Sequence, residues 1–490
     1  MKIAIEGNLK DALPGFYIQT FSLLFFPEDN IFGKNGQSKN HIKIYANKNE
    51  NRVDILVEIW YNGKAASKTA KTDGGDPLVC AGRLFYGAAS ELTGIYPPWG
   101  MHTGIRPAKT AGEILEKNGF DERKTINILR DNYLMTEKKA ALALETHKNG
   151  SLHRCGGPPP FTKGGEKKDF SLYISIPFCP TRCKYCSFVS FATPRLLKLI
   201  PEYIEKLLEE IGLIAEIVRG MRLKTIYIGG GTPTVLDEKQ LEMILNSVKD
   251  NFDLGNLLEY TAECGRPDTI TKEKLELLKS FGIDRVSVNP QTLNDGILEK
   301  IGRCHTAEDF FSAFEAAREA GIKNINTDCI IGLADESKSS MINTIETLAD
   351  LKPENITIHS LCIKKSADIK AEKIYNADDK NLNETLEDIY DILKTAGYRP
   401  YYMYRQKYTA GNLENTGFCL EGRECLYNIY MMDELMTIFG VGAGAMTKIV
   451  KEGRIERIAN YKYPYEYIER DFQINGENNQ NKLKFLGESQ

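Results

Sequence analysis

From residue 171 onward, short apolar runs alternate with longer stretches in which apolar residues recur at helical spacing. The short runs are rich in β-branched residues, so the alternation is typical of strands that are each followed by a helix. The predicted strands are 172–176, 225–228, 258–263, 285–288, 326–331 and 355–359, and the predicted helices between them are 195–219, 237–251, 272–281, 307–320 and 339–351. Such β–α repeats predict an α/β fold, a parallel sheet with helices outside, either open or closed into a partial barrel.

The first 149 residues have a different pattern of apolar and polar positions. Two apolar runs, 41–46 and 52–61, flank a polar Asn-Lys-Asn-Glu-Asn turn, which predicts a hairpin. Helical patterns follow at 77–92, 108–118 and 121–148. The segment 96–107, Tyr-Pro-Pro-Trp-Gly-Met-His-Thr-Gly-Ile-Arg-Pro, is too rich in proline and glycine to be regular.

Changes in this pattern of apolar and polar positions predict the domain boundaries. Residues 1–149 form an α+β domain, and 150–169 form a linker because they lack any hydrophobic period. The β–α repeats occupy 170–378. A small α+β extension, 379–490, contains a helix up to residue 396, an aromatic segment and the small-residue run 440–445.

The chain has 490 residues and a formal net charge of −4, so no basic surface for nucleic acid is expected. Polar residues interrupt the apolar run 16–26, which is too short to span a membrane, and the start lacks the features of a signal peptide. We therefore expect a cytoplasmic protein without a membrane partner. In that compartment the 11 cysteines are mostly thiols or metal ligands.

Three cysteines, Cys179, Cys183 and Cys186, follow the first predicted strand with C-x3-C-x2-C spacing. Three thiolates so close together can hold a [4Fe–4S] cluster, which normally has four ligands, so one iron is left open to a substrate. A structural zinc site would need a fourth ligand at finger spacing, and the nearest candidates, His153 and Cys155, lie in the predicted linker. The spacing therefore favours an iron–sulfur cluster.

Further candidates follow later strands, where parallel sheets bind ligands. The glycines of Gly229-Gly-Gly-Thr-Pro end the second strand and would let a ligand approach the backbone. Glu263 ends the third strand. Asp328 lies inside an apolar strand, where an unpaired charge is costly, so we expect it to have a function.

The segment Tyr173-x-Ser-Ile-Pro-Phe-Cys-x3-Cys-x-Tyr-Cys, followed by Gly229-Gly-Gly-Thr-Pro-Thr234, resembles radical SAM proteins of the oxygen-independent coproporphyrinogen III oxidase family. The resemblance covers about 171–447, and the region before it resembles the extra domain of the HemZ-type coproporphyrinogen dehydrogenases. It implies a partial (β/α)6 barrel with the cluster loop at its mouth. It also implies that S-adenosylmethionine (SAM) binds the open iron and yields a 5′-deoxyadenosyl radical. In this family the radical removes a hydrogen β to a propionate carboxylate, and coproporphyrinogen III becomes protoporphyrinogen IX.

The resemblance also assigns roles residue by residue. Cluster ligands are Cys179, Cys183 and Cys186. The SAM contacts that it implies are Tyr173 and Tyr185 beside the cluster, Gly230, Gly231 and Thr232 at the methionine, Glu263 at its ammonium, Arg303 at its carboxylate, Gln291 and Asp328 at the ribose, and Met446 at a second SAM. Implied partners are a tetrapyrrole substrate and a low-potential electron donor of the ferredoxin or flavodoxin type, and we expect a monomer.

Two positions depart from the best-studied branch of the family. Ser175 stands where that branch has histidine, and Phe188 stands where it has cysteine. In the latter respect the loop approaches the haem-chaperone branch, which would bind haem through His102, His305 or His359. The alternatives are therefore a haem chaperone or a radical SAM enzyme acting on another tetrapyrrole, whereas the long N-terminal region favours the dehydrogenase.

Overall fold

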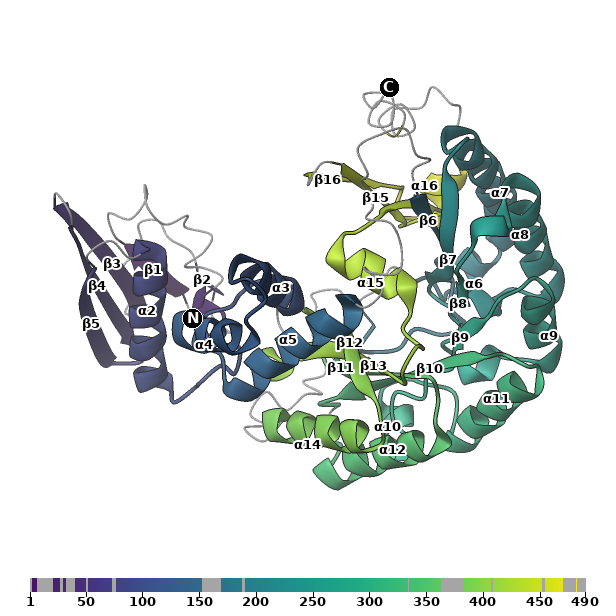
Figure 1. Ribbon diagram of the computed structural model, residues 1–490. Coiled ribbons are helices and arrows are strands. Elements are labelled where there is room, and N and C mark those ends of the chain that lie inside the picture. Colours follow the sequence, from purple (N-terminus) through teal and green to yellow (C-terminus); the bar gives the residue numbers. More distant parts are fainter. Residues whose placement is uncertain are drawn as a thin grey trace. The chain divides into compact units, whose positions relative to one another are not determined.

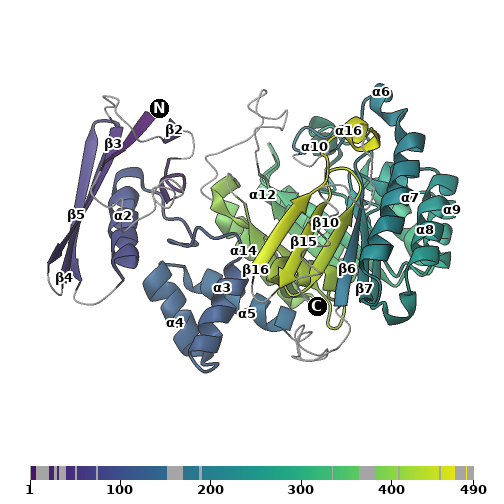
Figure 2. The same ribbon diagram turned by 90° about the horizontal axis from the view of Figure 1, so that it is seen from above.

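The computed structural model describes residues 2–6, 21–26, 30–31, 40–49, 52–72, 76–151, 169–186, 190–333, 335–362, 382–406, 409–451, 454–469 and 482 (Figures 1 and 2). The chain divides into two compact units. The first unit contains residues 1–147 and 403–414, and the second contains 148–402 and 415–490. Most of the predicted linker, 152–168, lies outside the described residues.

The first unit contains a five-stranded sheet in the order β2-β1-β3-β4-β5. The predicted hairpin is confirmed as the antiparallel pair β3 and β4. Strand β5 was not predicted, because its Lys-Ala-Ala-Ser-Lys-Thr-Ala-Lys-Thr sequence lacks large apolar residues. The strands are β1 Lys2–Glu6, β2 Asn30–Ile31, β3 Asn40–Asn49, β4 Arg52–Tyr61 and β5 Lys64–Thr72.

Helix α2, Pro77–Thr93, buries Phe85 against this sheet. The rings of Phe85 and Phe21 pack edge to face, with their centroids 5.7 Å apart. Two more helices are α3, Pro107–Lys117, and α4, Glu122–Tyr133. The pattern predicted as one helix over 121–148 is broken, because Leu134 ends α4 in the left-handed conformation and α5 starts anew at Glu137–Ser151.

The irregular segment 96–107 is closely packed within the first unit. Trp99 is fully buried, and its indole Nε1 donates to Glu414 Oε2 at 2.7 Å. Lys139 Nζ donates to the other oxygen of this carboxylate at 2.6 Å. Burial alone would raise the pKa of Glu414, but the Lys139 charge and the hydrogen bonds from Lys139 and Trp99 together hold the pKa below its usual value.

The second unit contains the predicted parallel sheet. Strands β6 to β11 pair in parallel and in sequence order, which confirms all six predicted strands. The full order is β12-β13-β11-β10-β9-β8-β7-β6-β14-β15-β16. The strands are β6 Asp169–Ile176, β7 Arg222–Gly230, β8 Glu259–Ala262, β9 Arg285–Ser287, β10 Asn324–Ile331, β11 Asn355–Ser360, β12 Arg399–Arg405, β13 Glu414–Cys419, β14 Thr437–Val441, β15 Met446–Lys451 and β16 Arg454–Ala459.

Helices that follow these strands cover the outer side of the curved sheet in Figure 1, and α15 lies on its inner side. Each helix predicted between the strands is present, with α6 and α7 sharing the first stretch. The helices are α6 Pro194–Leu197, α7 Ile200–Ile217, α8 Glu238–Asn251, α9 Lys272–Ser280, α10 Asp295–Lys300, α11 Ala307–Glu319, α12 Lys338–Leu351, α14 Leu382–Thr395, α15 Leu426–Asp433 and α16 Pro464–Ile468. None of the described helices is long and apolar enough to cross a membrane.

The two faces of the parallel sheet differ in polarity. The register aligns the apolar row Ile174, Ile228, Ala262, Val286 and Ile325 across five strands. The next row toward the amino ends is Tyr173, Tyr227, Thr261, Arg285 and Asn324. Because successive side chains point to opposite faces, the apolar row packs under the helices and the inner face is polar.

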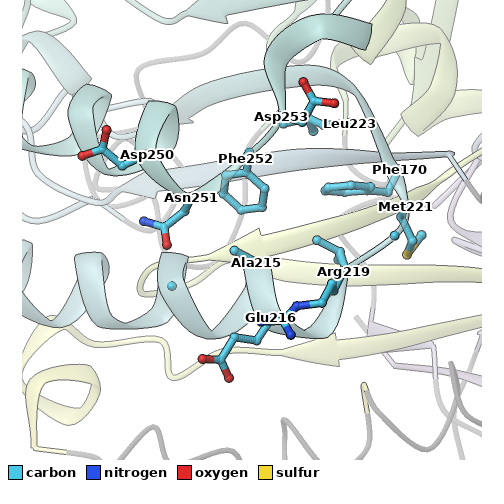
Figure 3. Close-up of a pocket in the computed structure, with 13 residues that line it drawn as sticks. Phe170, Ala215, Glu216, Arg219, Met221, Leu223, Asp250, Asn251, Phe252 and Asp253 are labelled. Carbon is cyan, nitrogen blue, oxygen red and sulfur yellow. The ribbon is translucent and has the colours of Figure 1, made fainter.

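At the amino edge of the sheet a pocket of about 460 Å³ lies between the ends of α7 and α8 (Figure 3). The rings of Phe170 and Phe252 line its interior, and Glu216, Arg219 and Asp253 also line it. It lies at the edge opposite to the predicted cluster loop.

Candidate active site

The predicted site residues of the second unit gather at the carboxyl edge of the parallel sheet. The cysteine loop follows β6, the glycines end β7, and Glu263 follows β8. Gln291 follows β9, and Asp328 lies on β10. Ligands bind at this edge in folds built from β–α repeats.

The cysteine loop is held by backbone hydrogen bonds on both sides. Cys179 N–H donates to Phe191 O at 3.1 Å, and Cys186 N–H donates to Cys183 O at 3.1 Å. Thr232 N–H donates to Phe178 O at 2.8 Å, which ties the loop to the segment after β7. Phe188 lies outside the described residues.

The three thiols influence one another. Burial raises the pKa of Cys179, and the nearby Cys186 and Cys183 raise it further, whereas Thr232 and Arg266 lower it. The Arg266 guanidinium lies 3.6 Å from Cys183 Sγ. A cation beside a thiol favours the thiolate, the form that binds iron.

These residues fit a [4Fe–4S] cluster with three protein ligands. No three histidine, cysteine, aspartate or glutamate side chains within the described part of the chain are arranged around a single metal ion. In a cubane each thiolate binds a different iron, so its ligands lie farther apart than those of one ion. Three thiols on one loop with an adjacent cation match that donor set.

The glycine segment after β7 is shaped by its contact with the cysteine loop. A Cβ atom on Gly231 would lie 2.5 Å from Phe178 O and 3.0 Å from Cys179 Sγ. Gly230 has φ +116°, a conformation that side chains disfavour. Only glycine therefore allows the two loops to approach this closely.

Glu263 faces the same segment. Its Oε1 accepts a hydrogen bond of 2.5 Å from Tyr227 Oη, and its Oε2 accepts one of 3.2 Å from Gly230 N–H. Burial raises the pKa of Glu263 to about 7, although the Tyr227 hydrogen bond opposes the shift. Within the described residues no arginine pairs with this carboxylate, so it can accept a ligand ammonium.

Three tyrosine rings stack beside Glu263. The ring centroids of Tyr227 and Tyr427 lie 4.4 Å apart with an angle of 22° between the ring planes, and the ring centroid of Tyr173 is 6.2 Å from each of them. Tyr427 comes from α15, whose first turn donates backbone hydrogen bonds to the buried carboxylate of Glu259. The predicted SAM contact Tyr173 is thus part of an aromatic wall on the inner face.

Several donors surround the Asp328 carboxylate. Asn326 Nδ2 donates to Oδ1 at 2.7 Å, and Asn289 Nδ2 donates to Oδ2 at 2.8 Å. His359 Nε2 lies 3.7 Å from Oδ2. Burial would raise the pKa of Asp328, but these neighbours together hold it below its usual value. The side chain is therefore an ionised acceptor, as a ribose partner requires.

Gln291, Arg303 and Tyr185 lie around the same edge. Gln291 is buried with φ +68°, and its backbone N–H donates to Asp328 O at 2.9 Å. Arg303 donates from Nε and Nη2 to Tyr185 Oη, at 3.2 and 3.1 Å, and from Nη1 to Gly265 O. Tyr185 is thereby joined to Arg303 rather than standing alone beside the cysteines.

The small-residue run 440–445 lies next to the site. Strand β14 pairs in parallel with β6, so Gly440 lies opposite Tyr173. Ser175 Oγ donates to Ala443 O at 2.9 Å. Met446 begins β15 and is 41% exposed, and no contact in the described part of the chain joins its side chain to the other candidates.

Sequence reasoning missed Tyr227, Arg266 and Asn289, and named His359 only as a haem ligand. Tyr227 could have been found, because it lies on the polar face of a strand two residues before Gly229, and Asn289 could have been found, because it directly follows the predicted strand 285–288, two residues before Gln291. Arg266 has no such signal, since it reaches Cys183 from a loop.

Comparisons with known proteins agree with this geometry. Residues 173–348 match the Radical SAM superfamily. The chain is 36% identical over 401 residues to the oxygen-independent coproporphyrinogen-III oxidase-like protein HemZ of Bacillus subtilis (strain 168), covering 80% of this chain and 78% of that protein. It is 32% identical over 284 residues to the haem chaperone HemW of Lactococcus lactis subsp. lactis (strain IL1403), covering 57% of this chain and 69% of the chaperone.

A solved structure has the same fold. The coproporphyrinogen III oxidase HemN from Escherichia coli superposes with a TM-score of 0.53 at 23% identity, over 64% of this chain and 70% of that one. The predicted α/β fold with β–α repeats is thus confirmed for the second unit.

Proposed function

We propose, from the premise that the chain belongs to the radical SAM superfamily and to its oxygen-independent coproporphyrinogen III oxidase family, that it decarboxylates coproporphyrinogen III. Its cofactors are the [4Fe–4S] cluster and SAM of that superfamily. When bound, they supply a carbon radical able to remove a hydrogen atom. In the proposed reaction that hydrogen lies β to a propionate carboxylate, and the resulting radical would lose carbon dioxide and pass one electron to a one-electron acceptor, which leaves a vinyl group. Two such steps give protoporphyrinogen IX.

Different side chains would bind the cluster, the methionine part of SAM and the ribose. Cys179, Cys183 and Cys186 hold the cluster, and a reductant of low potential, a ferredoxin or flavodoxin, supplies its electron. Glu263 accepts the methionine ammonium, because its carboxylate already faces the glycine segment. Asp328 accepts ribose hydroxyls, and the N–H groups that Arg303 has left serve the methionine carboxylate.

The length of the match supports the choice of substrate. The similarity to HemZ covers 80% of the chain, whereas the similarity to the Lactococcus chaperone covers 57%. The match to HemZ therefore includes parts of this chain that the match to the chaperone does not cover. This shared length is the single observation that carries the proposal.

The test is an anaerobic assay of the reconstituted full chain with SAM, a reductant and coproporphyrinogen III. We expect protoporphyrinogen IX and 5′-deoxyadenosine, identified by mass spectrometry, and neither product from Cys183→Ala. Formation of 5′-deoxyadenosine without a new porphyrin would reject this substrate. A different tetrapyrrole product would assign the chain to another reaction of the same chemistry.

A haem chaperone is the second candidate, and the 32% identity to HemW favours it. It predicts stoichiometric haem binding with a shifted Soret band, which His359→Ala or His305→Ala would abolish. Absence of any shift with wild-type protein would reject it.

A further inference from the structure

Tyr227 connects three features of the site that the family resemblance treats separately. It lies on β7, two residues before Gly229, so both face the inner side of the sheet. Its hydroxyl donates to Glu263 Oε1 at 2.5 Å. Its ring belongs to the tyrosine stack, with its centroid 4.4 Å from that of Tyr427 and 6.2 Å from that of Tyr173.

Gly229 makes room for this contact. A Cβ atom at residue 229 would lie 2.8 Å from Glu263 Oε2 and 2.9 Å from the Tyr227 ring. The missing side chain allows the Glu263 carboxylate to lie over the strand, against the Tyr227 hydroxyl. Any other residue at 229 would displace one of the two partners.

The two oxygens of Glu263 then have different roles. Oε1 is held by Tyr227, and Oε2 accepts the Gly230 N–H at 3.2 Å. Together these bonds fix the plane of the carboxylate at the glycine segment that meets the cysteine loop. The remaining lone pairs can receive a ligand cation.

We propose that Tyr227 is a positioning residue that orients the Glu263 carboxylate toward the ammonium group of SAM and stabilises its ionised form. This inference rests on the SAM chemistry of the superfamily and is independent of the porphyrinogen substrate. Burial keeps the pKa of the Tyr227 phenol well above its usual value, so the hydroxyl remains a donor throughout the working range of pH.

The direction of the pH dependence follows from Glu263. Its pKa of about 7 means that half of the carboxyl groups are protonated near neutrality. A bound ammonium favours the carboxylate, so SAM should bind more weakly as the pH falls below about 7. The titratable groups that face Glu263 are Tyr227 on β7, Tyr173 on β6, Asp328 on β10, His359 on β11, Tyr427 on α15 and the adjacent Cys264.

The test uses Tyr227→Phe, which removes one oxygen and keeps the stacked ring. The dissociation constant of SAM is measured by anaerobic calorimetry on the reconstituted full chain from pH 6 to pH 9. We expect the midpoint of the profile to move up by about one pH unit, because the lost bond stabilised the carboxylate. At pH 7 the affinity should then fall by about five- to tenfold.

Tyr260→Phe is the matched control. Tyr260 lies on β8, is buried, and its hydroxyl has no hydrogen-bond partner within the described part of the chain. Its profile should superimpose on that of the wild type. A Tyr227→Phe profile with an unmoved midpoint, or one weakened equally at every pH, would overturn the proposal.

Glu263→Gln provides a second decision that does not depend on the stability of Tyr227→Phe. It should flatten the profile near pH 7, and Tyr227→Phe added to it should have no further effect on SAM affinity. A profile that still rises near pH 7, or additive losses in the double variant, would overturn the proposal. Porphyrin products are not measured, so a wrong substrate assignment leaves this result unchanged.

Discussion

Replacing Gly231 by alanine should damage the cluster site without touching a cysteine. The added Cβ would lie 2.5 Å from Phe178 O and 3.0 Å from Cys179 Sγ, whereas ordinary contacts begin near 3.4 Å. The cysteine loop must therefore move by about 0.9 Å at its closest point. Overpacking of this kind typically costs about 2 kcal/mol, which corresponds to about a 30-fold lower population of the cluster-binding conformation.

The assay measures iron and sulfide per chain after reconstitution, together with the rate at which a chelator removes the iron. Gly231→Ala should hold much less cluster and lose it much faster than the wild type. Gly212→Ala is the control, because Gly212 lies in α7 and its nearest neighbour to an added Cβ is Asn251 Oδ1 at 3.9 Å. A Gly231→Ala protein with a full cluster that resists the chelator as well as the wild type would refute the packing of the two loops.

Three other substitutions test separate parts of the structure. Glu414→Gln removes the carboxylate charge opposite the buried Lys139 and should destabilise the first unit by about 3–5 kcal/mol in thermal melts. Folding lowers the pKa of Glu414, so the stabilisation by its carboxylate should be present above pH 4.5, the pKa in the unfolded chain, and be lost as the pH falls below that value. Melting temperatures that are independent of pH from 3 to 6 would contradict this. Arg266→Ala should lower the reduction potential of the cluster by on the order of 50 mV in a redox titration, and Arg266→Lys should restore most of that potential. An unchanged potential in Arg266→Ala would contradict the contact with Cys183. His359→Gln should weaken SAM binding by only about two- to fivefold, since the pair with Asp328 is partly exposed, and a loss of 100-fold would mean that His359 contacts the ligand directly.

The parallel sheet could be predicted because each strand carries its own signal. The strands alternate an apolar outer row with a polar inner row, and amphipathic helices separate them. Strand β14 was not predicted as part of that sheet, because its place beside β6 depends on pairing across the chain and not on a local pattern.

The site residues show the same division. The cysteine spacing and Asp328 were visible in the sequence, since the first is a ligand pattern and the second a charge inside an apolar strand. The contact of Arg266 with Cys183, the bond from Tyr227 to Glu263 and the pairing of Arg303 with Tyr185 depend on which loops meet at the sheet edge. Their partners are 83, 36 and 118 residues away in the chain, beyond the reach of any local pattern.

The most direct test concerns the three cysteines themselves. Reductive cleavage of SAM to 5′-deoxyadenosine is measured for the reconstituted wild type and for single alanine variants of Cys179, Cys183 and Cys186. Cys304→Ala is the control, because this exposed thiol lies beside the same loop, with its Sγ 3.7 Å from Thr181 Oγ1. We predict that each of the three variants loses cleavage and that Cys304→Ala retains it. Full cleavage by any of the three, or equal loss in Cys304→Ala, would contradict the assignment of the cluster to this loop.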